Sequence, residues 1–316
     1  MKNFLTIIIC GLLIFITIYN IEPITDKVVN ITQNNSNNVV LTDSNDYTKK
    51  TSYKYVQLTT NLTPYSYQDL LNIYYTIINS GVENATFYCP SEYKDCIKDV
   101  EMISTDELIL THLNNYIHPF NSFISIKTSF NSSDVTLKIK HIYNDDEINR
   151  LSTDVDALIT KLVPNEKSDY DKIKIIHDYI INTTKYDIGN SPSEPNSRKI
   201  SSKATGALYN HVATCNGYTD LMAIFLSKLG IDNFKIATTP DEISYKATGH
   251  VWNAVKIDNE WRHLDLTWDD PVSKDQKDYL FHRYFLVTTD ELFEADKGDT
   301  IIEEHNFNKS YYLEFN

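Results

Sequence analysis

The chain has 316 residues, and 41% of them are hydrophobic, which is enough for about two domains with sizeable buried cores. Acidic residues outnumber basic residues by 43 to 29, so the formal net charge is -14 at pH 7. This charge argues against a nucleic-acid partner, because phosphate binding needs a basic surface, and it names no substrate.

Residues 1–21 contain one charged side chain, Lys2, followed by an apolar run from Phe4 to Ile21. The run is about 18 residues long, just enough to cross a bilayer as a helix. It is either an uncleaved signal anchor or a cleaved signal peptide, and the lack of an Ala-x-Ala pattern after it favours the anchor. Because Lys2 precedes the run and acidic residues follow it, we expect an extracytoplasmic protein, anchored in the cell membrane or secreted.

Residues 22–50 are polar and poor in aromatic side chains, as in a flexible linker. A smaller α/β domain is expected over residues 51–145. It begins with a helix that stops at Gly81, and a second helix is predicted from Asp106 to Tyr116. The alternating segments "SFISIKTSF" and "DVTLKIKHIY", on either side of "NSSD", predict a β-hairpin. No chemical motif is present in this domain, so we expect it to act as a spacer, a partner contact or a shield.

Two cysteines, Cys89 and Cys96, lie close together around turn-forming residues. Because cysteines outside the cytoplasm tend to pair, we expect a disulfide between them, with two free thiols as the alternative. The stretch offers too few ligands for a zinc site. Of the other two cysteines, Cys10 is interpreted as part of the apolar N-terminal segment, and Cys215 is expected to remain a thiol.

Residues 146–316 are predicted to form the second domain. Helices are expected at about 145–163 and 168–184, the second of them capped by Ser168. His177 lies at the edge of the apolar stripe of the second helix, and it is interpreted as a structural rather than a catalytic histidine.

Cys215 begins the amphipathic stretch "CNGYTDLMAIFLSKLG". Apolar residues recur there at the spacing of one helical face, and Gly230 supplies a C-terminal stop. With Thr214 as N-cap, Cys215 lies in the first turn, where backbone N–H groups and the helix dipole stabilise a thiolate. On position alone, a reactive thiolate and a buried structural cysteine are equally good interpretations.

The stretch "GHVWNAVKIDNEWRHLDLTWDDP" predicts two strands joined by a tight turn at Asp258-Asn259. A two-residue loop places Asp265 diagonally opposite His250 on one face of the pair. A three-residue loop would put Asp265 on the other face, so the turn length decides whether a His–Asp pair can form. His263 alternates with its neighbours and is predicted to face solvent.

Cys215, His250 and Asp265 would supply a nucleophile, a base and an orienting group. The histidine accepts the thiol proton and later protonates the leaving amine, while the carboxylate fixes the tautomer of the ring and stabilises the imidazolium. Such a set supports acyl transfer through a thioester.

The stretches "TGALYNHVATCNGYTDLMAIFLSKLGI", "GHVWNAVKIDNEWRHLDLTWDDP" and "YFLVTTDEL" resemble the core of the transglutaminase-like superfamily. The resemblance covers roughly residues 165–295 and implies a papain-like α+β fold, in which a helix bearing the cysteine packs on an antiparallel sheet. It also implies the three catalytic roles just described. Two departures are Ala213, where a glycine is common, and Asn216, where animal transglutaminases have a tryptophan. The second departure weakens the case for protein cross-linking.

Candidate substrate contacts are Trp252, Asn216 and Tyr209, although packing within the hairpin is the stronger interpretation for Trp252. The backbone N–H of Cys215 is the expected first donor of an oxyanion hole. The candidates for the second donor are Tyr209, Asn210 and His211.

The sequence therefore predicts an extracytoplasmic thiol enzyme that acts on amide bonds of protein or peptide substrates, cell-envelope proteins among them. No metal or organic cofactor is indicated. The thioester passes either to water, as in a protease or amidase, or to an amine, as in a transglutaminase. Hydrolysis is favoured, because transamidation needs a site that excludes water. The alternative hypothesis is a surface module that keeps the fold for binding or scaffolding and has lost catalysis.

Overall fold

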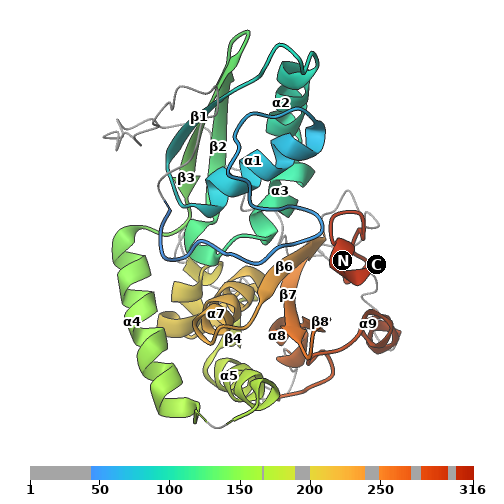
Figure 1. The fold of residues 1–316 in the computed structure, drawn as a ribbon. Helices are drawn as coiled ribbons and strands as arrows, with labels where there is room; N and C mark the ends of the chain where they lie inside the picture. The colour runs from blue at the N-terminus through green and yellow to red at the C-terminus, as the bar shows by residue number, and fades with distance from the viewer. Residues whose placement is uncertain (1–43, 166, 189–199, 239–248, 272–278, 298–303) are drawn as a thin grey trace, which may run out of the picture. The chain divides into compact units, whose positions relative to one another are not determined.

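The computed structural model describes residues 44–316 except residue 166 and residues 189–199, 239–248, 272–278 and 298–303. The described residues form two compact units, residues 44–144 and residues 145–316 (Figure 1). Each unit combines helices with a three-stranded antiparallel sheet, so the prediction of a mixed helix and sheet protein is confirmed. The assignment of residues 51–145 and 146–316 to separate domains stays a prediction.

The predicted apolar helix at residues 1–21 lies outside the described residues, as do residues 22–43 of the predicted linker. Within the part of the chain that the structure describes, every helix is too short or too polar to cross a lipid bilayer. The anchor and the signal peptide both stay predictions.

Residues 44–144 contain a sheet with the strand order β1-β3-β2, so β3 is central. The strands are β1 (Asn84–Tyr88), β2 (Phe123–Phe130) and β3 (Asp134–His141), and the helices are α1 (Tyr67–Asn79), α2 (Cys96–Thr105), α3 (Glu107–Asn115) and the 3-10 turn η1 (Pro119–Asn121). β2 and β3 are the predicted hairpin. Its loop is held by Asn131, whose Oδ1 accepts hydrogen bonds from the backbone N–H groups of Ser133 (2.9 Å) and Asp134 (2.8 Å).

Both helices predicted in this unit are present. α1 is followed by Gly81, whose φ of 77° is a left-handed conformation that favours glycine at the end of a helix. α3 begins after Asp106, whose carboxylate accepts hydrogen bonds from the backbone N–H groups of Leu108 (2.9 Å) and Ile109 (3.1 Å). Local capping chemistry therefore sets both helix ends that the sequence predicts.

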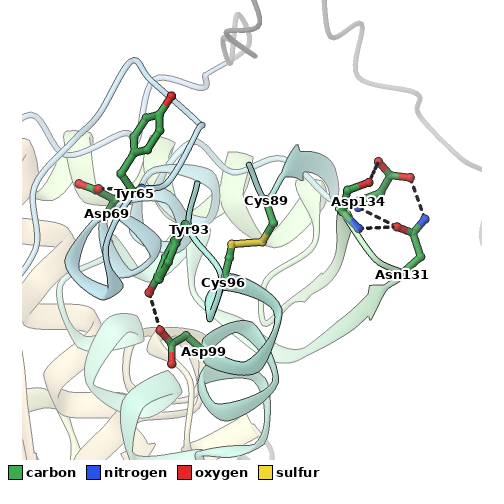
Figure 2. Close-up of a disulfide and its surroundings, with 9 residues drawn as sticks. Tyr65, Asp69, Cys89, Tyr93, Cys96, Asp99, Asn131 and Asp134 are labelled. Atoms are coloured by element: carbon green, nitrogen blue, oxygen red, sulfur yellow. Dashed lines mark hydrogen bonds between the residues drawn. A yellow bond between two sulfur atoms is a disulfide. The ribbon is translucent and has the colours of Figure 1, made fainter. Parts of the chain in front are cut away.

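The predicted disulfide between Cys89 and Cys96 is present, with a Cα–Cα separation of 5.8 Å (Figure 2). It joins the residue after β1 to the first residue of α2, and both cysteines are buried. Tyr93 lies in the loop that the disulfide closes, and its hydroxyl donates a hydrogen bond to Asp99 of α2. Because disulfides persist in oxidising compartments, this bond is typical of a protein outside the cytoplasm.

Residues 145–316 contain a sheet with the strand order β6-β7-β8, built from β6 (Asn233–Thr238), β7 (His250–Ile257) and β8 (Glu260–Leu264). Its α-helices are α4 (Asp145–Leu162), α5 (Asp169–Thr183), α7 (Cys215–Lys228), α8 (Leu266–Asp269) and α9 (Thr289–Asp296). The shorter elements are the parallel strands β4 (Lys185–Tyr186) and β5 (Val212–Ala213), the π-helix η2 (Gly206–Asn210) and the 3-10 turn η3 (Leu313–Phe315). α7 packs against β6, β7 and α5 (Figure 1). A helix that begins with a cysteine thus covers an antiparallel sheet, as the family resemblance implies.

The turn between β7 and β8 has the two-residue form that the sequence predicts. Asp258 and Asn259 both have left-handed backbone angles, with φ of 52° and 64°, as a type I′ turn requires. Ile257 pairs with Glu260 across this turn. This register places His250, the first residue of β7, across from the residues that directly follow β8.

Candidate active site

Cys215 is the first residue of α7, and Thr214 occupies the N-cap position, as predicted. The Thr214 hydroxyl makes no capping hydrogen bond, so the cap is formed by its backbone alone. The N-terminus of a helix stabilises negative charge, which favours the thiolate form of Cys215. The cysteine side chain is 0% exposed and packs with Ala237, Val251 and Tyr186. A substrate therefore reaches the sulfur only when neighbouring residues move.

The first turn of α7 is held against the backbone of residues 201–203. The N–H of Thr214 donates a hydrogen bond to the carbonyl of Ser201 at 2.9 Å. Gly217 lies so close to this segment that a Cβ atom there would be 2.3 Å from the same carbonyl oxygen. Only glycine permits this approach, and it fixes the start of the helix where Cys215 lies.

Side-chain hydrogen bonds connect α7 to β7 one turn beyond the cysteine. The Thr219 hydroxyl donates to the carbonyl of Val251 (3.1 Å), and the side-chain amide of Asn253 donates to the carbonyl of Thr219 (3.0 Å). Val251 directly follows His250, and Thr219 lies one helical turn after Cys215. These bonds therefore hold the first turn of α7 beside the start of β7, where the histidine lies.

His250 and Asp265 meet as the sequence predicts. The Nε2 atom of His250 lies 2.5 Å from Oδ2 of Asp265, and both residues are almost fully buried. This contact leaves Nδ1 as the ring nitrogen that can exchange a proton with a thiol. The imidazole also stacks on Trp252, with ring centroids 5.7 Å apart and an interplanar angle of 18°. The ring orientation is therefore fixed by a carboxylate on its edge and an indole on its face.

The hairpin pattern predicted that Asp265 lies within a strand, and this is wrong. β8 ends one residue earlier, and Asp265 is the N-cap of α8. Its Oδ1 accepts hydrogen bonds from the backbone N–H groups of Thr267 (2.8 Å) and Trp268 (3.3 Å). Its Oδ2 faces His250. One oxygen thus fixes the carboxylate to α8, and the other orients the imidazole.

A second histidine, His305, contacts the same carboxylate. Its Nε2 lies 2.9 Å from Oδ2 of Asp265, and its Nδ1 lies 2.9 Å from Oδ1 of Asp296 at the end of α9. Sequence reasoning missed His305 because it lies 40 residues after Asp265, beyond the segments that carry the family resemblance. A chain of carboxylate, imidazole, carboxylate and imidazole therefore leads from the partly exposed Asp296 to the buried His250.

This chain keeps Asp265 ionised. Burial alone would raise the pKa of Asp265, but the charge of His250 and the hydrogen bonds from His250 and His305 hold it below its ordinary range. Burial would lower the pKa of His305, but its hydrogen bonds to Asp265 and Asp296 raise it above its ordinary value. An ionised Asp265 is the form that stabilises an imidazolium.

The predicted substrate contacts have different surroundings. Trp252 is fully buried and its indole N–H donates to Nδ1 of His263 at 3.1 Å, in agreement with a packing role. The Tyr209 hydroxyl donates to Asp154 of α4 at 2.9 Å. Asn216 is half-buried in the first turn of α7. Substrate contact by these residues stays a prediction.

The prediction that His263 faces solvent is wrong, because its side chain is fully buried. Its backbone pairs with Val287, so a later segment of the chain covers this position, and its Nε2 lies 3.0 Å from the hydroxyl of Thr289. Burial, with the charges of His305 and Lys309, lowers the pKa of His263 well below its ordinary value. A neutral His263 accepts the indole hydrogen bond, which requires an unprotonated nitrogen.

A tyrosine–carboxyl pair lies one turn after the cysteine. The Tyr218 hydroxyl donates to Oδ2 of Asp270 at 2.5 Å. Burial raises the pKa of Asp270 from 3.8 to about 6, although the Tyr218 hydrogen bond and the charge of Lys185 oppose the rise. Burial and the charge of Asp270 also raise the pKa of Tyr218. The pair connects α7 to the chain that leaves α8.

Comparison with known proteins places the family match over this site. Residues 156–266 match the sequence model described as the Transglutaminase-like superfamily, and this range includes Cys215, His250 and Asp265. Kyphoscoliosis peptidase of Homo sapiens is 24% identical over 155 residues, which is 45% of this chain and 22% of that protein. The Mus musculus protein of the same name is 23% identical over the same shares. The chain thus spans about a fifth of the length of these relatives.

Two solved structures are also similar in part. A crystal structure of a TGase shares 15% identity, with a TM-score of 0.35, over 49% of this chain and 47% of that chain. The structure described as "Putative Cysteine Protease from Cytophaga hutchinsonii" shares 17% identity, with a TM-score of 0.28, over 45% of this chain and 61% of that chain. The sequence match therefore identifies residues 156–266 of the chain as a segment of the transglutaminase-like superfamily.

Proposed function

We propose that the chain is an extracytoplasmic thiol enzyme that cleaves amide bonds of proteins or peptides through a thioester on Cys215. The observation that carries the proposal is the buried contact between His250 and Asp265 at the start of β7, beside which the first turn of α7 is held. The family match over residues 156–266 supports it, because that superfamily includes enzymes with a cysteine nucleophile.

The proposed reaction gives each of the three side chains a distinct role. Nδ1 of His250 takes the thiol proton, and the sulfur of Cys215 forms a bond to the amide carbonyl carbon. The resulting oxyanion accepts a hydrogen bond from the backbone N–H of Cys215. When the C–N bond breaks, His250 returns its proton to the leaving amine. Asp265 remains ionised throughout and stabilises the imidazolium.

The thioester then passes its acyl group to water, which releases a carboxylic acid and restores the thiol. Transfer to an amine would instead form a new amide bond. We favour hydrolysis, because an extracytoplasmic site has water available at all times and Asn216 differs from the tryptophan of animal transglutaminases. The name peptidase that the curated relatives bear agrees with this choice.

A peptide library, incubated with and without an added primary amine and scored by mass, tests this function. Wild type is expected to give products that carry the mass of one added water at the new carboxyl end, and Cys215→Ala is expected to give none. Dominant amine adducts would contradict hydrolysis in favour of transamidation. Unchanged peptides under all conditions would contradict both reactions.

The complete burial of Cys215 favours a second candidate function, a binding or scaffolding module without catalysis. In such a module the thiol is a packing group, and substitution by a residue of similar size leaves binding intact. The library separates the two candidates, because the module binds peptides without changing their mass.

The disulfide between Cys89 and Cys96 supports a location in an oxidising compartment. We place the protein at the cell membrane through residues 1–21, with cell-envelope proteins or peptides as substrates. Fractionation of cells that make the full chain or a chain without residues 1–21 tests the attachment. The full chain is expected in the membrane fraction at its full mass, and a soluble product whose mass is lower by that of the removed N-terminal residues would instead show a cleaved signal peptide.

A further inference from the structure

A second cluster of polar side chains lies between α5 and the segment that precedes α9. His177 and Asp178 are adjacent on α5, and His282 lies 104 residues after Asp178 in the sequence. One ligand atom from each residue lies within 4.8 Å of the other two. Two imidazoles and a carboxylate are the ligand types that bind zinc and similar divalent transition metals.

We propose that His177, Asp178 and His282 form a binding site for a divalent transition-metal ion of the zinc class. The ligand atoms are Nδ1 of His177, Oδ1 of Asp178 and Nε2 of His282. Nδ1 of His177 lies 2.9 Å and Nε2 of His282 lies 2.6 Å from that same Oδ1. A metal ion at this point of convergence would have three protein ligands and a fourth position open to water.

The hydrogen bonds of His177 provide the first argument. Its Nδ1 faces Asp178, and its Nε2 lies 3.1 Å from Oδ2 of Asp269, which is also fully buried. A protonated imidazole donates to both carboxylates, whereas a neutral imidazole has one N–H group and turns a nitrogen lone pair toward the other carboxylate. With the N–H at Nε2 and a metal cation at Nδ1, both contacts are satisfied by the neutral ring. The contact with Asp269 then has the form of the carboxylate–histidine–metal arrangement, in which a carboxylate outside the coordination sphere orients the ligand.

The surroundings of His282 provide the second argument. Its Nε2 lies 2.6 Å from Oδ1 of Asp178 and 3.0 Å from Nζ of Lys174, while that Nζ also lies 2.6 Å from Oδ2 of Asp178. A single ring nitrogen cannot donate to the carboxylate and also accept from the ammonium group. If Lys174, whose side chain is 39% exposed, turns into solvent, a metal ion can take its place and satisfy both ligands.

Packing holds the two imidazoles in position. The ring of Phe285 contacts His177 and His282 edge-on, with centroid distances of 5.0 Å and 5.6 Å. Asp269 also accepts the backbone N–H of Tyr284 at 3.0 Å, so the same carboxylate orients His177 and fixes the segment that bears His282. The ligands are thus presented by a supported framework.

Titration of the full chain with Co²⁺, followed by visible absorption and by displacement with Zn²⁺, tests the site. Wild type is expected to bind one ion with the spectrum of a low-coordinate nitrogen and oxygen site. His282→Asn is expected to weaken binding by about 100-fold or more, because a ligand is lost, and Asp269→Asn by about 10- to 100-fold, as for outer carboxylates of other sites. Lys174→Met is expected to strengthen binding, because it removes the competing cation.

Matched controls separate this site from incidental binding. His211→Asn removes an exposed imidazole elsewhere, and Lys172→Met removes another lysine of α5 that pairs with a carboxylate, Asp169. Both are expected to bind as wild type does, and so is Cys215→Ser, which removes a thiol that could itself bind the ion. No binding by wild type, or equal binding by His282→Asn, would overturn the proposal. Because thermal unfolding without metal reports whether each variant folds, a misfolded variant is recognised independently.

Discussion

Asp270 offers a stability test that depends on one buried carboxyl group. Burial raises its pKa from 3.8 to about 6, so the folded chain holds this proton more tightly than the unfolded chain does. Between about pH 4 and pH 6 the folded state therefore binds more protons than the unfolded state, and stability falls as the pH rises. Above the folded pKa the carboxyl is ionised in both states, and the full cost of burying its charge is present.

The size of this cost follows from the two pKa values. The difference between 3.8 and about 6 corresponds to about 3 kcal/mol for a site without solvent screening. Partial hydration reduces this, so we expect about 2 kcal/mol. Asp270→Asn removes the charge and keeps an oxygen that can accept the Tyr218 hydroxyl. The variant should therefore gain about 2 kcal/mol of unfolding free energy relative to wild type between pH 4 and pH 7.5.

Urea denaturation of wild type and Asp270→Asn at several pH values between 4 and 7.5 measures this change. The test compares how the difference in unfolding free energy between the two proteins changes with pH. Any effect of the amide on packing that does not depend on pH therefore cancels. Asp258→Asn, at the exposed turn between β7 and β8, is the matched control and should show no gain that grows with pH. A relative loss of stability of Asp270→Asn as the pH rises would refute the reasoning, because it would mean that the ionised carboxylate stabilises the fold.

Three further predictions concern other contacts. His305→Ala removes a hydrogen bond to an ionised carboxylate, which contributes about 1.5 to 3 kcal/mol, so kcat/KM should fall about 10- to 100-fold. His305→Gln should recover part of this loss, and an equal loss in both variants would contradict a positioning role. Replacing Cys89 and Cys96 together by serine should lower the unfolding free energy by about 2.5 kcal/mol in denaturant titrations, and an unchanged midpoint would argue against the cross-link. Lys235→Ala should cost about 3 to 5 kcal/mol, because it removes the ammonium group that lies 3.0 Å from the buried carboxylate of Asp220, and adding Asp220→Ala should restore part of this in the same titrations.

Local patterns were sufficient to predict the elements whose ends depend on nearby residues. The helices α1, α3, α4, α5 and α7 follow from apolar spacing and capping residues. The β7–β8 turn follows from Asp258-Asn259, and its register determines where His250 and Asp265 meet. These features depend on residues close in sequence, so sequence reasoning finds them.

Features that depend on distant residues could not be predicted in this way. His263 alternates like a surface residue, but it is buried because residues around Val287 pair with β8. His305 reaches Asp265 from a segment without periodic pattern, and His282 reaches α5 from 104 residues away. Burial and polar convergence of this kind arise from tertiary packing, which the local sequence does not encode.

The most direct test of the central claim is the rate at which iodoacetamide alkylates Cys215, measured by mass at several pH values for wild type, His250→Ala and the control His141→Ala. Because burial of Cys215 slows alkylation in all three proteins, the test is the comparison: an activated thiolate predicts alkylation near pH 6 that is faster in wild type and in the control than in His250→Ala. Slow alkylation that rises only near the ordinary thiol pKa of about 8.5, and that His250→Ala leaves unchanged, would contradict the account.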